Sequence, residues 1–328
     1  MTTNRTPRLG IGLPVYNGAT YLAEAIEALL GQTYEDFELI ISDNASTDAT
    51  EDICRQYAAQ DARIRYIRQP RNIGGLLNHK VVFEYCRGEL FQWAADDDLY
   101  GRDLLLRCVE VLDANPHVVA VHSRTASIEG ETGEQARGLE YPLATASDRA
   151  PERLRSMLFD DGGDDDYGVI RTEVLRRIPP YDSYHRSDRT LMAELALHGR
   201  FYQVPAWLYF RRHHEASLEG TARTIRQKST AWDPRRANHS TARLLAEYML
   251  GYVRAIAQAP LPVSEKAACY RHLMAWMGDR AMRRTAASRV GRPWLSMVPA
   301  PTTADSTTNI TRVGAIADIV AGREATAS

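Results

Sequence analysis

Strand-like and helix-like segments alternate through the first 125 residues, and this alternation restricts the chain to few folds. Short apolar runs that predict buried strands lie at 8–16, 37–43, 64–68, 89–95 and 117–123. The segments between them carry apolar residues at helical spacing, as Leu22, Ile26 and Leu29 show. Such alternation is typical of a mostly parallel sheet with helices on both faces. The sequence therefore predicts the α/β class.

Polar residues gather where the predicted strands end. In open parallel sheets, ligands bind beyond the carboxyl ends of the strands. The polar clusters at these positions are Tyr16-Asn17-Gly18, Asp43-Asn44, Asn72 to Asn78 and Asp96 to Asp98. Their shared position indicates a ligand site at one edge of the sheet.

Composition and missing motifs exclude several classes of protein. A formal net charge of −2 argues against a nucleic-acid partner. The four scattered cysteines and the absence of an apolar leader or an apolar run of about 18 residues favour a cytoplasmic protein. The run GIGLPVYNG lacks the third glycine of the dinucleotide fingerprint, and the chain has no Walker A loop, G-x-S-x-G or H-E-x-x-H motif.

The remaining pattern divides the chain into regions. We expect a loop at 125–150, then a block at 151–217 with a helix at 187–199, and amphipathic helices beyond 220. The predicted division is a main domain at 1–220, with halves 1–125 and 126–220, a helical region at 221–298, and a flexible tail at 299–328.

Three consecutive aspartates, Asp96, Asp97 and Asp98, follow a buried strand and are the strongest chemical feature. Carboxylates are preferred ligands of Mg²⁺ and Mn²⁺, which in turn bind diphosphates. The alternative is a solvated acidic turn in which Asp98 caps the next helix. For the second triplet, at 164–166, we expect a solvated loop.

Each of the other candidate site residues also has more than one interpretation. Asp43 is placed to accept a hydrogen bond from the imide N–H of uracil or thymine, or to form a turn. Tyr16 suits stacking on the base or packing. Asp188 suits a general base or a helix cap, with Glu194 or the second triplet as the next candidate base. Arg212 suits a phosphate, and His213 or His214 suits a metal.

Together these segments resemble the inverting family 2 glycosyltransferases of GT-A fold, in particular the bacterial spore-coat polysaccharide type. The resemblance covers about residues 8–217. It rests on LPVYNGATYLAEAIEALLGQTYEDFELIISDNASTD, RNIGGLLNH, FQWAADDDLY, SDRTL and RRHHEAS. It implies a Rossmann-like nucleotide-sugar-binding half at 1–125, an acceptor-binding half at 126–220 and a C-terminal helical extension.

The resemblance also implies a role for each matching residue. Asp188 is the catalytic base, and Asp96, Asp97 and His214 hold Mn²⁺ or Mg²⁺. The nucleotide-sugar contacts are Pro14, Tyr16, Asn17, Asp43, Asn72, Gly75, Asn78, Asp96 and Arg212. The chain departs from the family pattern at Ala95, where most relatives carry the first aspartate of D-x-D-D, so the metal-binding pair among the three aspartates is not fixed by the alignment.

The expected reaction moves a sugar from a nucleotide diphosphate sugar, UDP- or dTDP-linked, to an acceptor hydroxyl with inversion. The expected setting is cell-surface polysaccharide or glycolipid assembly, with a carbohydrate, lipid-linked or small-molecule acceptor. The alternatives are tailoring of a secondary metabolite, a sugar-1-phosphate nucleotidyltransferase and a non-catalytic sugar-binding protein. The nucleotidyltransferase is disfavoured because GIGLPVYNG carries no basic residue.

A basic, tryptophan-containing region near the C-terminus suggests a further contact. Its residues are Arg271, Trp276, Arg280, Arg283, Arg284, Arg289, Arg292 and Trp294. Two readings are open: peripheral contact with an anionic membrane at the cytoplasmic face, or a homodimer interface.

Overall fold

The computed structural model describes residues 6–129, 137–139, 144–159, 167–178, 186–214 and 224–289. For residues 129, 137–139 and 281–289 it describes the backbone only. Within these ranges the strands form one nine-stranded sheet of order β3-β2-β1-β4-β8-β6-β9-β5, with β7 paired to β6. The α/β fold class predicted from the sequence is confirmed.

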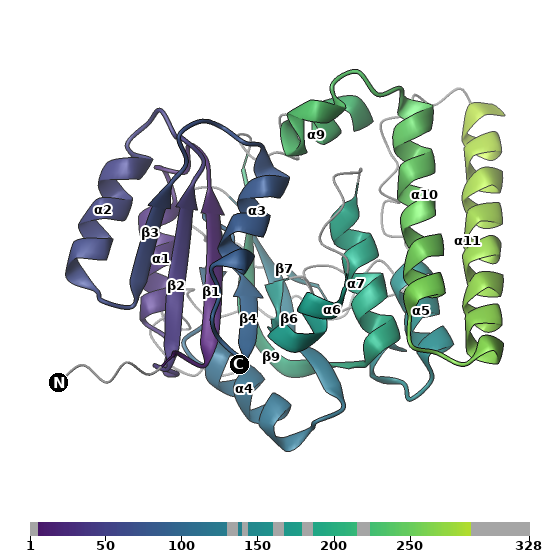
Figure 1. Ribbon diagram of the computed structural model, residues 1–328, viewed down its shortest axis with the longest axis horizontal. Coiled ribbons are helices and arrows are strands. Elements are labelled where there is room, and N and C mark those ends of the chain that lie inside the picture. The colour runs from purple at the N-terminus through teal and green to yellow at the C-terminus, as the bar shows by residue number, and fades with distance from the viewer. Residues whose placement is uncertain are drawn as a thin grey trace.

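The first half is the parallel sheet that the alternating pattern predicts. Its strands are β1 (Leu9–Val15), β2 (Phe37–Asp43), β3 (Ile64–Arg68) and β4 (Leu90–Trp93). They are connected by α1 (Leu22–Leu30), α2 (Thr50–Gln60) and α3 (Gly75–Glu84). The pairs β2–β3, β1–β2 and β1–β4 are all parallel, so the four strands point their carboxyl ends to one edge (Figure 1).

The second half mixes strand directions. Its elements are β5 (Leu99–Tyr100), α4 (Leu104–Ala114), β6 (Val118–Glu129), β7 (Arg137–Leu139), η1 (Ala144–Ala146), α5 (Ala150–Phe159), β8 (Val169–Arg171), α6 (Thr172–Arg177), α7 (Ser187–His198) and β9 (Arg200–His213). Strand β8 runs antiparallel to both β4 and β6, whereas β6 and β9 are parallel.

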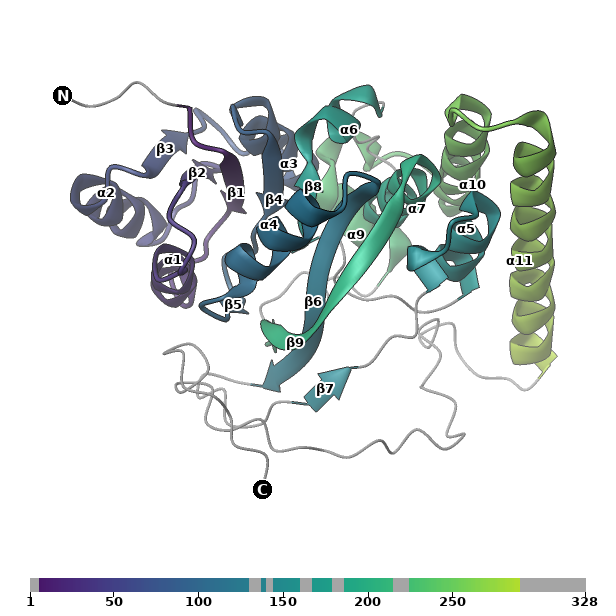
Figure 2. The ribbon, with the colours of Figure 1, turned by 90° about the horizontal axis from the view of Figure 1, so that it is seen from below.

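The expected loop at 125–150 is partly wrong. Strand β6 continues to Glu129 because it pairs with β9 along almost its whole length, from Val118 opposite Arg200 to Glu129 opposite His213. Strand β7 then pairs back onto β6. Backbone hydrogen bonds along this ladder stabilise the strand. The Thr- and Glu-containing sequence of the segment does not by itself predict a strand. Figure 2 shows β6 and β9 lying side by side.

Apolar side chains cover the sheet on both faces. Leu9, Ile11 and Leu13 of β1 belong to the same buried cluster as Ile26 of α1. On the opposite face of β1, Gly12 lies where α3 packs against the strand. A Cβ at this position would lie 2.6 Å from a methyl of Val82. Helices therefore lie close against the strands on both sides, and the polar carboxyl edge is the part of the first half left for a ligand.

The C-terminal helices pack against the second half. They are α9 (Ile225–Trp232), η3 (Pro234–Arg236), α10 (Thr241–Gln258) and α11 (Val263–Arg289). Tyr248, Tyr252 and Trp276 are buried in one apolar cluster with Met157 of α5 and Leu195 of α7. Figure 1 shows α10 and α11 on the side of the molecule opposite α2. The division at residue 220 stays a prediction, and the tail at 299–328 lies outside the described residues.

None of the described helices combines the length and the apolar character needed to cross a membrane. The side chains of Arg283, Arg284 and Arg289 and all of Arg292 and Trp294 lie outside the described part of the chain, so membrane contact and dimerisation stay predictions.

The shared apolar cluster predicts that α11 unfolds together with the sheet. Trp276→Ala removes a ring that contacts Tyr252 at 5.4 Å between centroids, and it should lower the free energy of unfolding by about 3–5 kcal/mol. Urea unfolding followed by far-UV circular dichroism should show one transition at lower urea. Met274→Ala, at a position that is 66% exposed on the same helix, is the control and should shift the midpoint little. A separate early transition in Trp276→Ala would mean that the helices form an independent unit.

Candidate active site

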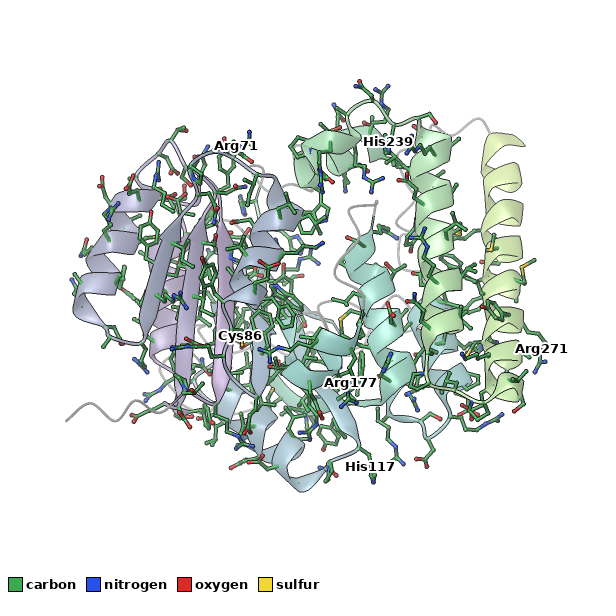
Figure 3. All side chains as sticks on the ribbon, in the orientation of Figure 1. Arg71, Cys86, His117, Arg177, His239 and Arg271 are labelled. Atoms are coloured by element: carbon green, nitrogen blue, oxygen red, sulfur yellow. The ribbon has the colours of Figure 1, made fainter. Side chains whose placement is uncertain are left out.

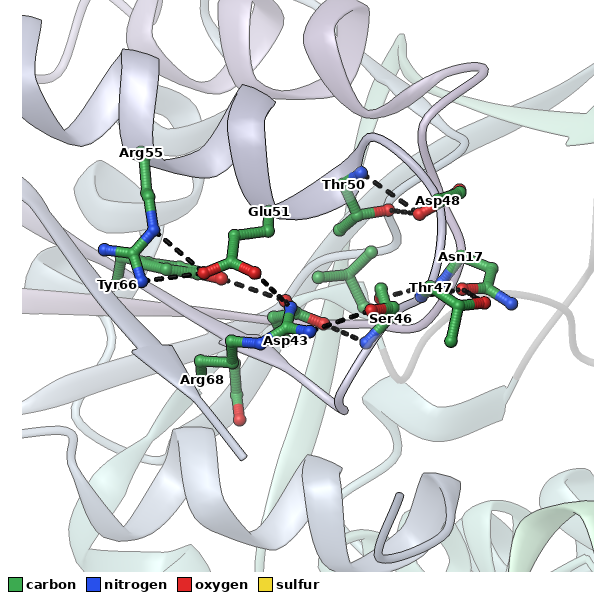
Figure 4. A network of polar contacts seen from close by, with 12 residues as sticks. Asn17, Asp43, Ser46, Thr47, Asp48, Thr50, Glu51, Arg55, Tyr66 and Arg68 are labelled. Carbon is green, nitrogen blue, oxygen red and sulfur yellow. Dashed lines mark hydrogen bonds and ion pairs between the residues drawn. The ribbon is translucent and has the colours of Figure 1, made fainter. Parts of the chain in front are cut away.

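Hydrogen bonds join the loops that follow β1 and β2 into one surface. The amide of Asn17 donates to Ser46 Oγ at 2.9 Å, and the amide of Thr47 donates to Asn17 Oδ1 at 2.8 Å (Figure 4). Asn17 and Ala45 both have left-handed backbones, with φ of 53° and 58°. Tyr16 is 48% exposed here, while Pro14 is buried within β1. Tyr16 is therefore open to a planar ligand, and its stacking role stays a prediction.

Asp43 is used inside the protein. Its carboxylate is 0% exposed and accepts hydrogen bonds from the Ser46 amide at 2.8 Å and the Tyr66 hydroxyl at 2.9 Å. It also forms an ion pair with Arg68. These contacts fix the turn after β2 (Figure 4). The predicted hydrogen bond to a base would have to compete with them, so the role of Asp43 as a base reader stays a prediction, and its visible role is structural.

Asn72 and Asn78 also hold backbone in place. Asn78 is buried, donates from Nδ2 to the Ser42 carbonyl at 2.8 Å and accepts from Ser42 Oγ at 2.7 Å. Asn72 Oδ1 accepts from the Gly74 amide at 2.9 Å. These bonds place the start of α3 beside the end of β2. Both residues therefore act by holding the backbone of the site in position.

The three consecutive aspartates point into three different environments. Asp98 is buried, accepts a hydrogen bond from the Arg212 amide at 2.8 Å and is bonded to the Tyr209 hydroxyl. Asp97 Oδ2 lies 2.9 Å from His214 Nε2. Asp96 lies against the loop after β1, because a Cβ on Gly18 would come within 2.1 Å of its Oδ2. Asp98 therefore has a structural role, and Asp96 and Asp97 remain the candidates for metal binding.

The acidic turn is electrostatically unbalanced. Burial raises the pKa of Asp96 well above its usual range, and the charge of Asp97 raises it further. A cation beside the pair would lower that cost. Carboxylate oxygens with an imidazole nitrogen also suit Mn²⁺, and to a lesser degree Mg²⁺. Among the described residues no three His, Cys, Asp or Glu side chains are grouped closely enough to hold a metal ion, so the metal-binding role of Asp96, Asp97 and His214 stays a prediction.

Arg212 is held by the protein itself. Its side chain is 1% exposed and pairs with Glu24 at 2.7 Å. Its Nε donates to the Asp97 carbonyl at 2.9 Å, and its guanidinium lies 4.5 Å from the Tyr21 ring centre. The predicted phosphate contact would require release from Glu24 and stays a prediction. Tyr21 also lies 4.9 Å from the His214 ring.

The sequence reasoning missed Tyr21 and Glu24. Both lie at the start of the first helix, directly after the polar loop that follows β1. That position, beyond the carboxyl end of a parallel strand, was the available signal.

Asp188 lies in the first turn of α7, after Arg186, whose backbone is left-handed at φ 60°. The Asp188 side chain is partly exposed, and no hydrogen bond or ion pair to it is found among the described residues. Such a carboxylate is free to accept a proton. Its charge acts on His79, although burial outweighs it and lowers the pKa of His79 to about 4. The catalytic role of Asp188 stays a prediction.

Glu194, the next candidate base, lies further along α7, and burial raises its pKa to about 7. The other candidate bases, at 164–166, lie outside the described residues.

The raised pKa of Glu194 predicts a loss of stability with rising pH. Its pKa in the folded protein is about 7 against an ordinary 4.5, so the stabilising contribution is complete below pH 4.5 and disappears as the pH rises through 7. Glu194→Gln removes this titration and should raise the free energy of unfolding at pH 8 by about 1–2 kcal/mol, discounted for partial exposure, with little change at pH 4.5. Urea titrations at both pH values measure this, with the exposed Glu110→Gln as control. Equal stability of wild type and Glu194→Gln at pH 8 would contradict it.

Comparisons with known proteins concern the family and the fold. Residues 11–163 match the family model "Glycosyl transferase family 2". Chondroitin synthase of Escherichia coli is 29% identical over 143 residues, which cover 43% of this chain and 21% of that protein. The chain spans 33% or less of the length of two further curated relatives, both uncharacterized glycosyltransferases of Rickettsia.

Two solved structures share the fold. TarS of S. aureus in complex with UDP-GlcNAc superposes with a TM-score of 0.53 at 16% identity, covering 88% of this chain and 93% of that one. The mannosyltransferase PcManGT of Pyrobaculum calidifontis, in complex with GDP-Man and Mn²⁺, gives 0.50 at 18% identity, covering 87% and 81%. Identities this low establish the fold alone. With the family match, they lead to one conclusion: residues 11–163 match glycosyl transferase family 2, and the chain has the GT-A fold.

Proposed function

We propose that the protein transfers a sugar from a nucleotide diphosphate sugar, UDP- or dTDP-linked, to an acceptor hydroxyl with inversion at the anomeric carbon. One observation supports this most directly. The Asp97–His214 contact at 2.9 Å joins the turn after β4 to the end of β9, beside the carboxyl edge where ligands of parallel sheets bind.

In this proposal Asp188 removes the proton from the acceptor hydroxyl. The resulting oxygen attacks the anomeric carbon on the side opposite the nucleotide, the bond from that carbon to the diphosphate breaks, and the diphosphate leaves. One displacement inverts the carbon. The unpaired Asp188 carboxylate suits a general base because no cation among the described residues competes for its lone pairs.

Asp96, Asp97 and His214 would hold a divalent cation, Mn²⁺ or Mg²⁺. When bound, such a cation supplies charge neutralisation for the departing diphosphate. The raised pKa of Asp96 supports this assignment, because two neighbouring carboxylates, one of them desolvated by burial, are costly to ionise together without a counter-charge. The Mn²⁺ present with PcManGT gives the same indication for that fold.

The proposed donor and product classes rest on the similarity to known proteins. TarS binds UDP-GlcNAc and PcManGT binds GDP-Man, which supports a nucleotide sugar as the donor class. The similarity to chondroitin synthase supports the assembly of a polysaccharide. The cell-surface setting and the location at the cytoplasmic face of a membrane stay proposals.

Asp97→Asn should remove metal-dependent nucleotide binding while the protein stays folded. For the wild type, UDP with Mn²⁺ at 100 times the dissociation constant should stabilise the folded state by about 2.7 kcal/mol and raise Tm. The variant should show little shift, because the amide is a poor ligand for the cation. Asp52→Asn, an exposed position on α2, is the control. An unchanged Mn²⁺-dependent shift in Asp97→Asn would remove Asp97 from the metal site.

Asp188→Asn should separate binding from transfer. The amide has the same shape but cannot accept the proton, so kcat should fall by about 10²-fold or more while UDP affinity stays within a factor of about two. Nucleotide release and product mass measure the two quantities, and Glu194→Gln is the matched variant. Transfer at the wild-type rate in Asp188→Asn, with a large loss in Glu194→Gln, would move the base to Glu194.

A further inference from the structure

The segment formed by α9 and η3 lies over the start of α3. Gly74 has φ 87°, and a Cβ there would lie 2.6 Å from Pro234 and 3.0 Å from the Trp232 carbonyl. A Cβ on Gly75 would lie 2.9 Å from the Trp232 ring. Figure 1 shows α9 beside the upper end of α3. The two glycines therefore make room for Trp232, a residue that the family match at 11–163 does not include.

Trp232 is held firmly in this position. Its ring centre lies 4.7 Å from that of His79, with the rings tilted by 53°. Its Nε1 donates to Ser187 Oγ at 3.4 Å. The next residue, Asp233, is buried and pairs with Arg235 at 2.9 Å, which anchors the chain beyond the ring. The indole remains only partly buried, so it keeps some surface for a ligand.

Two hydrogen-bond acceptors, the Asp188 carboxylate and His79 Nε2, lie in the segments around the indole. Ser187 and Asp188 are adjacent in the first turn of α7, and the charge of Asp188 reaches His79. His79 Nδ1 lies 2.9 Å from the Gly75 carbonyl, and the low pKa keeps the imidazole neutral. Since a carbonyl only accepts, Nδ1 carries the proton and Nε2 is left as an acceptor.

This combination of groups suits one kind of molecule. A pyranose has an apolar face of C–H groups, which packs against an aromatic ring, and hydroxyls that donate to carboxylates and imidazoles. A phosphate would be repelled by Asp188, and a lipid chain would leave the acceptors without partners.

We propose that Trp232 is the platform on which a pyranose ring of the acceptor rests, beside Asp188, so that the acceptor is a glycoside. The inference rests on the proposed function and names the acceptor class. It also gives α9 a role, because that helix carries an aromatic ring to the start of α7, where Asp188 lies.

The experiment uses methyl glycopyranosides of glucose, galactose and N-acetylglucosamine as probes, with the full chain and saturating UDP. Saturation-transfer NMR should show contact with the C–H protons of one ring face for at least one probe. Trp232→Ala should weaken binding of that probe by about 10-fold, while Trp232→Phe should retain most of it. Trp207→Ala is the control, since Trp207 is a partly buried tryptophan whose cation–π contact is with Arg124.

Kinetic constants measured with the same probe then show whether Trp232 contributes to acceptor binding or to donor binding. Trp232→Ala should raise the acceptor KM about 10-fold and leave the donor KM unchanged. A raised donor KM with an unchanged acceptor KM would overturn the inference, as would equal saturation transfer in wild type and Trp232→Ala or none from any pyranoside. Failure of the proposed function looks different, because UDP would then not bind and no nucleotide sugar would be turned over.

Discussion

The buried carboxylate of Asp98 is the contact on which the rest of the site depends. By accepting hydrogen bonds from the Arg212 amide and the Tyr209 hydroxyl, it joins the turn after β4 to the last strand of the sheet. That bond brings Arg212 to the Asp97 carbonyl and His214 to the Asp97 side chain. One carboxylate of the three is thus used for structure, and its burial leaves its neighbours directed toward the site. In the proposed function the three consecutive aspartates therefore perform two different tasks.

Much of the first half could be predicted from the sequence. Strand β2 begins and ends where its apolar run does, since burial on both faces leaves a continuous hydrophobic signal. Strand β3 also has the predicted bounds, although it is an edge strand in which only Ile64 is buried. Strand β5 has two residues and β7 three, too few for any periodicity, and both exist only through pairing with distant strands. The location of the acidic turn was predictable, but the internal bonds of Asp43 and Asn78 were not. Arg68, Glu24 and Trp232 contact the candidate site from other elements of the fold. A local sequence pattern does not predict such contacts.

Backbone strain coincides with the same segments. Within the described residues, the non-glycine positions with positive φ are Asn17, Ala45 and Arg186. Each stands within two residues of a candidate site residue: Tyr16, Asp43 and Asp188. A left-handed backbone costs about 1–3 kcal/mol at such positions and persists only where the surroundings enforce it. The hydrogen bonds between Asn17, Ser46 and Thr47 provide that enforcement for the first two.

The contacts of Arg212, near the end of β9, have a consequence for the order of folding. The bond from Asp98 to the Arg212 amide spans 114 residues, and the pair between Arg212 and Glu24 spans 188. Contacts that close such long loops form late, after the local units of strand, helix and strand. An intermediate holding only β1 to β4 would possess the carboxyl edge of the parallel strands without the partners of the acidic turn. We therefore expect the last step in reaching the native topology to be the step that assembles the candidate active site.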